Sequence, residues 1–166
     1  MTSKQIQELA KQISSMLSES NNKYKETEAL LYNYIGYKET IVRNKQRIDN
    51  IIQNGAEEKA KSNKGEYVQG GIKEYGGLPE EEIRQIDHIL EENSKLEKRV
   101  IRIENALIHI EDDEYQEIIT LRYFKNKSIE EIATHLDVNE KTIARNRTRI
   151  INKLQTILFS EIIIGY

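Results

Sequence analysis

Apolar residues recur at alternating spacings of three and four along two long stretches of the chain. In residues 22–54 these positions hold Thr27, Leu30, Tyr34, Tyr37, Ile41, Asn44, Ile48 and Ile51. After Pro79 they hold Ile86, Ile89, Asn93, Leu96, Val100, Ile103, Leu107 and Ile110. This is the a/d pattern of helices that pack along a seam. We therefore expect a helix over 22–54, preceded by another over 3–18 and ended near Gly55, and a further long helix after Pro79.

Each of the two seams contains one polar residue, Asn44 in the first and Asn93 in the second. If the chain folds back as an antiparallel hairpin with Gly55 near Glu82, the two asparagines lie at the same level. A buried asparagine in a seam can fix the register of paired helices. We therefore predict a hydrogen bond between Asn44 and Asn93. The alternatives are that each faces water, or that the long helices pair between subunits.

The connection between the long helices has no helical periodicity. Residues 55–78 include the stretch "YVQGGIKEYGG", whose four glycines predict either a small two-stranded hairpin at Gly70–Gly71 or a flexible loop. Pro79 and the three glutamates after it predict a firm helix start, because proline and acids are favoured in the first turn.

The last part of the chain predicts shorter helices. Asp113 is expected to open a helix over "EYQEIITLRYF", and Ser128 and Glu131 have the spacing of a capping box. A short helix carrying Ile129, Ile132, Ala133 and Leu136 is followed by the turn "DVN" and by a longer helix from Asn139 or Glu140. This order is typical of a helix-turn-helix. The predicted fold is all-α, with a long antiparallel, coiled-coil-like hairpin in residues 1–111 and a helix-turn-helix domain in residues 112–166.

Composition narrows the class of protein. The 166 residues are 37% hydrophobic and 32% charged, with net charge −3 and no cysteine, so neither disulfides nor thiolate sites can form. Neither a signal peptide nor an apolar run of about 20 residues is present, so we expect a cytoplasmic protein outside the membrane. The three histidines share no metal-ligand spacing, and we find no nucleophile–base set. An enzyme, a metal site and a bound cofactor are therefore not expected.

Positive charge gathers in "NEKTIARNRTRIINKL", residues 139–154, which holds five basic residues and one acid. Lys141, Arg145, Thr148, Arg149 and Asn152 lie opposite the apolar stripe formed by Ile143, Ile150, Leu154 and Leu158. A basic helix face is often only solvated. Together with the capped short helix, with Ala133 where the helices cross and with Val138 in the turn, it predicts binding to the major groove of double-stranded DNA.

The stretch "DEYQEIITLRYFKNKSIEEIATHLDVNEKTIARNRTRIINKL" resembles region 4 of sigma-70-type factors, their promoter-binding helix-turn-helix. The layout of the whole chain is similar to phage and prophage regulators of late transcription, the ArpU and RinA group. The resemblance implies a promoter or operator and RNA polymerase as partners. It also implies that DNA is contacted by Asn139, Glu140, Lys141, Thr142, Ala144, Arg145, Thr148, Arg149 and Lys153, the last two of which would bind phosphates.

Three residues depart from the family pattern. Asp137 stands in the turn where glycine is commonest, although aspartate tolerates such backbone better than most residues. Asn146 replaces a usual aliphatic residue. Arg147 falls on the inward side of the helix, where it either pairs with an acid on the first helix or leaves the apolar stripe open.

The function expected from these features is a sequence-specific transcription regulator, most simply an activator. Two alternatives stay open: the small subunit of a phage terminase, which binds packaging-site DNA, and a coiled-coil adaptor that binds no DNA. A homodimer through the coiled-coil region is a further expectation. The apolar tail Ile162–Ile163–Ile164 is expected to pack on the helix-turn-helix or on the coiled coil.

Overall fold

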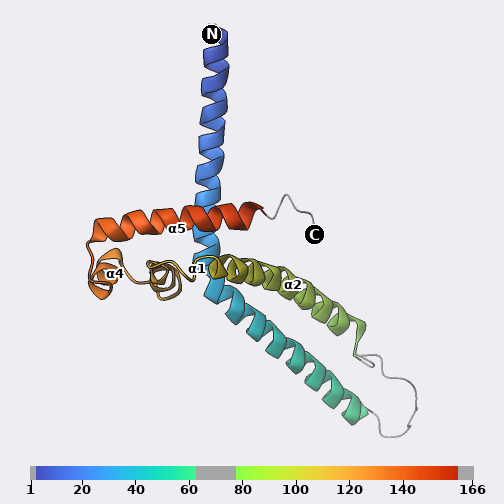
Figure 1. The fold of residues 1–166 in the computed structure, drawn as a ribbon. Coiled ribbons are helices and arrows are strands. Elements are labelled where there is room, and N and C mark those ends of the chain that lie inside the picture. The colour runs from blue at the N-terminus through green and yellow to red at the C-terminus, as the bar shows by residue number, and fades with distance from the viewer. Residues whose placement is uncertain (1–2, 63–77, 161–166) are drawn as a thin grey trace. The chain divides into compact units, whose positions relative to one another are not determined.

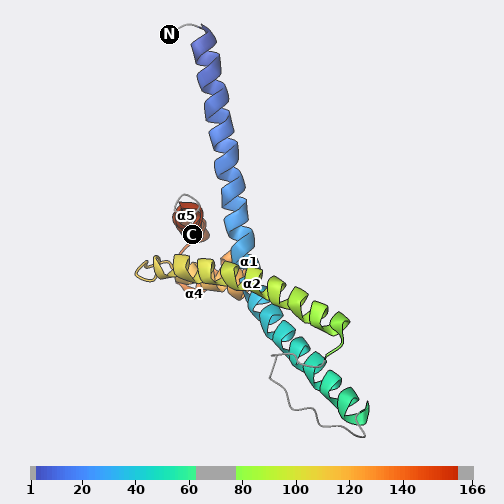
Figure 2. The same cartoon turned by 90° about the vertical axis from the view of Figure 1, so that its right-hand side faces the viewer.

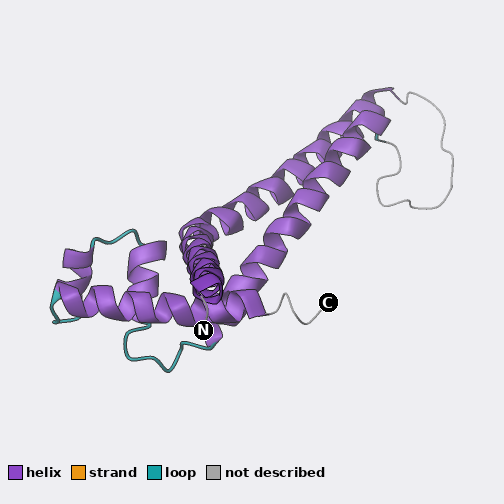
Figure 3. Ribbon diagram, turned by 90° about the horizontal axis from the view of Figure 1, so that it is seen from above, coloured by secondary structure: helices purple, strands orange, loops and turns teal. Residues whose placement is uncertain are grey.

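The computed structural model describes residues 3–62 and 78–160, and every regular element in these ranges is helical (Figure 3). The elements are α1 (Ser3–Ser62), α2 (Glu80–Ile108), α3 (Glu117–Ile119), the π-helix η1 (Thr120–Phe124), α4 (Ile129–His135) and α5 (Glu140–Ser160). The all-α fold is therefore confirmed. The expectations for Gly70–Gly71 and for the tail at 162–164 lie outside the described residues. No helix in the described ranges is long and apolar enough to cross a membrane.

Helix α1 is one continuous helix of 60 residues (Figure 1). The sequence predicts an interruption between residues 18 and 22, and that prediction is wrong. Serine and asparagine are weak helix formers there, but neither proline nor glycine interrupts the backbone. Glu19 and Lys23 form an ion pair of 2.6 Å one turn apart, and the Thr27 hydroxyl donates to the Lys23 carbonyl. These local contacts stabilise the helix next to the segment with the weakest helix formers.

Gly55 lies inside α1 and does not end it, which corrects the expected helix boundary. A Cβ atom at this position would lie 2.1 Å from Leu78 Cδ2 and 2.9 Å from Glu82 Oε2. The glycine therefore makes room for Leu78 and Glu82 against the surface of α1. The expected proximity of Gly55 and Glu82 is confirmed.

The contacts of the chain divide it into two compact units. One, the hairpin unit, is Gly36–Val100. The other, the composite unit, joins Met1–Ile35 to Ile101–Tyr166. The domain boundary expected at residue 112 stays a prediction.

In the hairpin unit, α1 and α2 lie side by side and run antiparallel (Figure 2). Ile48 packs with Ile86 and Ile89 in one apolar cluster. The Asn44 amide donates to Asn93 Oδ1 at 2.8 Å, and Asn93 is buried. The predicted hydrogen bond between Asn44 and Asn93 is therefore confirmed. It satisfies a polar group that the seam buries, and that it fixes the register of the two helices stays a prediction.

In the composite unit, α1 packs against η1 through aromatic side chains. The ring of Tyr32 meets the edge of Tyr123 at 4.6 Å between centroids, and the Tyr34 ring lies 4.8 Å from Phe124. The buried Tyr123 hydroxyl donates to the Glu28 carboxylate. Burial and this carboxylate together raise the pKa of Tyr123. Tyr32 and Tyr34 are thus packing residues.

Candidate nucleic-acid interface

A small apolar core holds the helix-turn-helix together. Ile132 and Ala133 of α4 pack with Ile143 of α5, and Ile118 and Leu121 complete the cluster. Ala133 is buried where α4 and α5 meet. The half-buried Val138 packs on the same cluster from the turn. The predicted roles of Ala133 and Val138 are therefore confirmed.

The segment before α4 is less regular than the sequence predicts. The α-helix expected from Asp113 begins only at Glu117, and it passes at once into the π-helix η1. Asp113 forms a tighter turn instead, because its carbonyl accepts from the Gln116 amide and its carboxylate accepts from the Tyr115 amide. Asn126, with φ of 54°, follows η1 and ends the segment.

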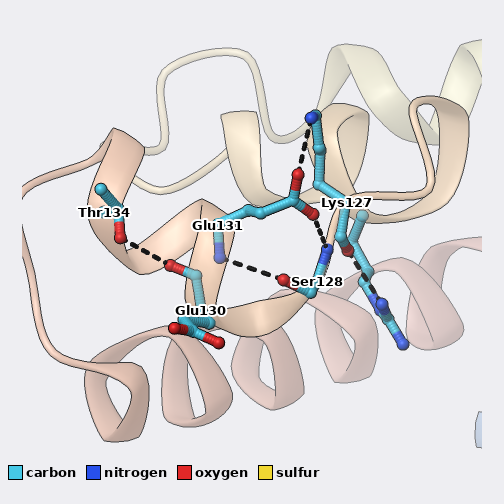
Figure 4. A network of polar contacts seen from close by, with 6 residues as sticks. Lys127, Ser128, Glu130, Glu131 and Thr134 are labelled. Atoms are coloured by element: carbon cyan, nitrogen blue, oxygen red, sulfur yellow. Dashed lines mark hydrogen bonds and ion pairs between the residues drawn. The ribbon is translucent and has the colours of Figure 1, made fainter.

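A network of polar contacts fixes the start of α4 (Figure 4). Ser128 Oγ accepts from the Glu131 amide at 3.1 Å, and Glu131 Oε2 accepts from the Ser128 amide at 2.7 Å. Lys127 Nζ lies 2.7 Å from Glu131 Oε1. The hydrogen bond from Lys127, with that from the Ser128 amide, lowers the pKa of Glu131 to about 2. The predicted capping box is confirmed, and Lys127 adds a charge that the prediction did not include.

The turn between α4 and α5 is held by backbone and side-chain bonds. Asp137 adopts φ of 52°, the left-handed conformation that favours glycine, and the Val138 amide donates to the Ala133 carbonyl at 3.0 Å. Asn139 Oδ1 then accepts from the Thr142 amide at 2.8 Å and from the Thr142 hydroxyl at 3.1 Å. Asn139 is therefore the N-cap of α5, and its side-chain nitrogen makes no hydrogen bond to a residue that the structure describes.

The outer face of α5 carries most of the residues that the sequence singles out. Exposed are Asn139, Glu140, Lys141, Arg145, Thr148, Arg149 and Lys153, and half-buried are Thr142 and Ala144. Lys141 and Arg145 make no hydrogen bond or ion pair to any residue that the structure describes. They are spaced by one turn on the face opposite Ile143 and Ile150, which are fully buried. Two cations are thus presented to solvent at the start of a helix.

An open groove runs along the N-terminal part of this face. Its lining includes five of the predicted residues, namely Asn139, Glu140, Lys141, Thr142 and Arg145. It also includes Tyr115, Glu130, Thr134 and Asp137, which the sequence does not single out as site residues. Glu130 and Thr134 could have been found from the pattern, because both lie opposite Ile132 on the short α4. The groove carries charges of both signs.

Arg149 is paired with Asp113, in the segment before α3, rather than free. Its two terminal nitrogens donate to the Asp113 carboxylate at 2.6 and 2.8 Å, and its Nε donates to Asn146 Oδ1 at 3.2 Å. The hydrogen bond from Arg149 lowers the pKa of Asp113 to about 2, and that of Arg149 is raised in turn. The sequence misses this pair because 36 residues separate its members.

Asn146 and Arg147 are the two residues of α5 that depart from the family pattern beside its apolar stripe. Asn146 is buried, and its amide donates to the Thr142 carbonyl at 3.0 Å while its oxygen accepts from Arg149. Arg147 is half-buried, and its Nε has no hydrogen-bond partner among the described residues. Its charge acts against the rise in the pKa of Tyr123. Asn146, not Arg147, therefore fills the inward position, and its polar atoms are satisfied.

The comparison with protein families decides the nature of this segment. Residues 112–154 match the family model of sigma-70, region 4. Region 4 is a helix-turn-helix DNA-binding region, and the match extends from the residue before Asp113 to Leu154 in α5. It covers about a quarter of the chain. No curated protein and no solved structure matches the chain significantly. In the described ranges, no group of three or more histidine, aspartate or glutamate side chains could hold a metal ion.

Proposed function

We propose that this protein is a sequence-specific DNA-binding transcription regulator that acts with RNA polymerase. The observation that carries the proposal is that Lys141 and Arg145, on the second helix of the region 4 match, are exposed and make no ion pair with a described residue. Helices in this position of a helix-turn-helix enter the major groove with their N-terminal residues against the base edges. Helix α5 is the recognition helix in this proposal.

The exposed residues divide by the kind of DNA contact that they suit. Arg145 can donate two parallel hydrogen bonds to a guanine, and Asn139 keeps its side-chain nitrogen for a base after capping α5. Lys141 and Lys153 suit phosphates, because a lysine ammonium makes no planar bidentate contact. Thr148 and Ala144 present small groups that can meet a thymine methyl.

The acids of the groove restrict how the DNA can lie. Glu130, Asp137 and Glu140 would repel phosphates, whereas a glutamate can accept a hydrogen bond from the amino group of cytosine. The proposal therefore places base edges, not the sugar–phosphate backbone, against the groove. The backbones then pass along the lysines on either side.

We propose a different role for Arg149 from the phosphate contact that the resemblance implies. Three of its five N–H donors are used by Asp113 and Asn146, and Asp113 neutralises its charge. Its side chain is still 49% exposed, so the remaining two donors can reach a phosphate. We expect Arg149 to position α5 first and to contribute less to the attraction of DNA than Lys141.

The wider setting follows the same resemblance. Region 4 of sigma factors works with RNA polymerase, and a long helical part precedes it here, as in the ArpU and RinA group. We therefore propose activation of phage or prophage late genes, with the helical part serving for assembly, including a homodimer. The match to region 4 supports this proposal more than it supports a terminase small subunit.

Capture of genomic DNA tests the proposal. The intact protein is incubated with sheared DNA from its source genome, and the bound fragments are sequenced, with Arg145→Ala as the loss variant. Arg47→Ala serves as the matched control, because Arg47 is an equally exposed arginine in the hairpin unit. We expect enrichment upstream of a late operon for the intact protein and for Arg47→Ala, and its loss in Arg145→Ala.

Other outcomes would change the assignment. Enrichment beside packaging genes would favour the terminase small subunit. Equal enrichment of all sequences by the intact protein and by Arg145→Ala would refute base recognition by Arg145. No binding to any duplex, with RNA polymerase present or absent, would refute DNA binding and favour the adaptor.

A further inference from the structure

The first five turns of α1 carry an apolar stripe that nothing in the described chain covers. We call Ser3–Ser20 the arm. Within it Ile6, Leu9, Ile13 and Met16 follow each other at spacings of three, four and three, and Leu17 lies beside them. These five side chains are between 47% and 71% exposed. Single exposed apolar residues are ordinary, but a row of five on one helix face marks an interaction surface.

The stripe belongs to a seam that is covered elsewhere in α1. With Ile6 as a heptad position a, the same position recurs every seven residues at Ile13, Ser20, Thr27, Tyr34, Ile41 and Ile48. From Thr27 onward all of these are buried, whereas Ile6 and Ile13 are not. The arm is therefore a part of one continuous helix face that lacks a partner among residues 3–62 and 78–160.

The seam of the arm also has a defined end. Position a is polar at Ser20, and the next position d is Lys23, whose ammonium lies 2.6 Å from Glu19 on the outside of the helix. After this polar step, packing within the composite unit begins with the fully buried Thr27. The open stripe is thus limited to about two and a half heptads, roughly 27 Å of helix.

The charged residues of the arm lie where they allow the arms of two copies to pack against each other. Between Gln5 and Leu17, the positions that flank the seam, e and g, hold Gln5, Ala10, Gln12 and Leu17, none of which is charged; the first charged flanking residue is Glu19 at position g, where the apolar stripe has ended. Lys4, Glu8 and Lys11 occupy positions c and f, away from the seam. Two copies in register can therefore approach along the apolar stripe without bringing like charges together.

We infer that the arm binds the arm of a second copy as a parallel, in-register, two-stranded coiled coil. Isoleucine at both a positions with leucine at a d position is the combination that favours two parallel strands, and the flexible Met16 fills the second d position. The seam is short, so the association is expected to be weak and dependent on concentration. The other candidate occupant is a helix of a different protein, for which the arm offers no charged residue beside its apolar stripe from Ile6 to Met16.

The dimer gives the proposed function a second recognition helix. Two copies of α5 on one DNA molecule would read two half-sites, and binding would become cooperative in protein concentration. This consequence rests on the proposed function, whereas the arm contact does not. Mass measured in the absence of DNA therefore tests the arm alone.

Analytical ultracentrifugation of the full chain over a range of concentrations tests the inference. We expect a monomer–dimer equilibrium for the natural chain and a monomer for Ile13→Asp, which places two carboxylates opposite each other in the seam. Ser15→Asp adds the same charge at an outer position c and should keep the dimer. Circular dichroism of all three chains checks that the helix persists, because Ile13 contacts no folded core in the monomer.

Disulfide trapping tests the direction of the strands. The chain contains no cysteine, so single substitutions report without interference. Met16→Cys should form a covalent dimer under mild oxidation, because residue 16 faces residue 16 of the second copy only in a parallel pair. Ser15→Cys should not. A monomer at every concentration, or a dimer untouched by Ile13→Asp, would overturn the inference, and trapping through Ser15→Cys alone would overturn the proposed seam.

Discussion

The hairpin unit and the helix-turn-helix reach a defined structure by opposite means. In the hairpin unit, two long helices share one seam, and the polar pair of Asn44 with Asn93 within it is expected to set their register. In the helix-turn-helix, short elements follow each other closely, and each start or turn has its own polar device, such as the capping box at Ser128. Long helices need few specific interactions at their ends, because many equivalent packing contacts along the seam together stabilise them. Short helices make too few packing contacts for this, so interactions of individual side chains determine where they begin and end.

The two regions also use buried polar groups differently. Asn93 lies within an apolar seam, and its amide serves to exclude other registers. Asn146 lies under the exposed face of α5, and its oxygen accepts from Arg149, which in turn is held by Asp113. The first group selects a pairing of helices. The second supports the surface that is proposed to meet DNA.

The largest expected effect comes from the apolar cores. Ile143→Ala in the helix-turn-helix and Ile89→Ala in the hairpin unit should each lower the free energy of unfolding by about 2–5 kcal/mol, because both side chains are almost fully buried. Urea denaturation followed by circular dichroism measures the loss. Only Ile143→Ala should weaken DNA binding under conditions where both proteins stay folded. Equal loss of DNA binding in both variants would show that the two regions are not separable.

The register device of the hairpin unit is the next test. Asn44→Ala removes the donor to the buried Asn93 Oδ1 and should cost about 1–3 kcal/mol of stability. Replacing both asparagines by leucine should restore or exceed the original stability but allow other pairings of the helices. Denaturation of the single and double variants measures the first effect, and solution mass measures the second. A double variant as unstable as the single one would contradict this role.

On the helix-turn-helix, Arg145→Ala should weaken binding to the cognate site by about 1–3 kcal/mol and relax the preference for one base pair. Lys153→Ala should weaken binding to all sequences alike and make the salt slope of log K shallower by about 1. Fluorescence anisotropy with cognate and scrambled duplexes at several salt concentrations separates the two. An unchanged preference in Arg145→Ala would remove it from the base contacts.

The smallest effect concerns the link between Asp113 and Arg149. The pKa of Asp113 is lowered to about 2, so its stabilising contribution is complete above about pH 4 and is lost as the pH falls toward 2. Asp113→Asn should cost about 1 kcal/mol at neutral pH, since the arginine is half exposed. It should also flatten the decline of stability between pH 4 and 2. Glu131 titrates in the same range, so Glu131→Gln is the matched variant that removes the other contribution.

What the sequence predicts well is what repeats or what is local. The seam positions, the asparagine pair, the start of α2 at Glu80 and the Ser128 capping box all follow from spacing over a few residues or from a sustained period. The Asp113–Arg149 pair does not, because it joins distant residues. The π-helix η1 does not follow from periodicity either, since the pattern of a short apolar segment does not distinguish it from an α-helix.

The candidate site shows the same limit. The exposed face of α5 is predicted from helical spacing alone, whereas the contribution of Tyr115 to the groove depends on the tight turn after Asp113. Gly55 illustrates a different failure. Glycine commonly ends helices, but here it makes space for Leu78, and only the tertiary packing distinguishes these two uses.

The continuity of α1 through Glu19–Asn22 has a mechanical consequence. Because α1 is continuous, the direction in which the apolar stripe of the arm points is fixed relative to the direction in which Glu28 and Tyr32 point toward η1. Removing one residue from this stretch would turn the arm by about 100° without disturbing either end, whereas inserting seven would almost restore its heading. The number of residues in Glu19–Asn22 therefore sets the rotation, about the axis of α1, of the apolar stripe of the arm relative to the side chains that contact η1.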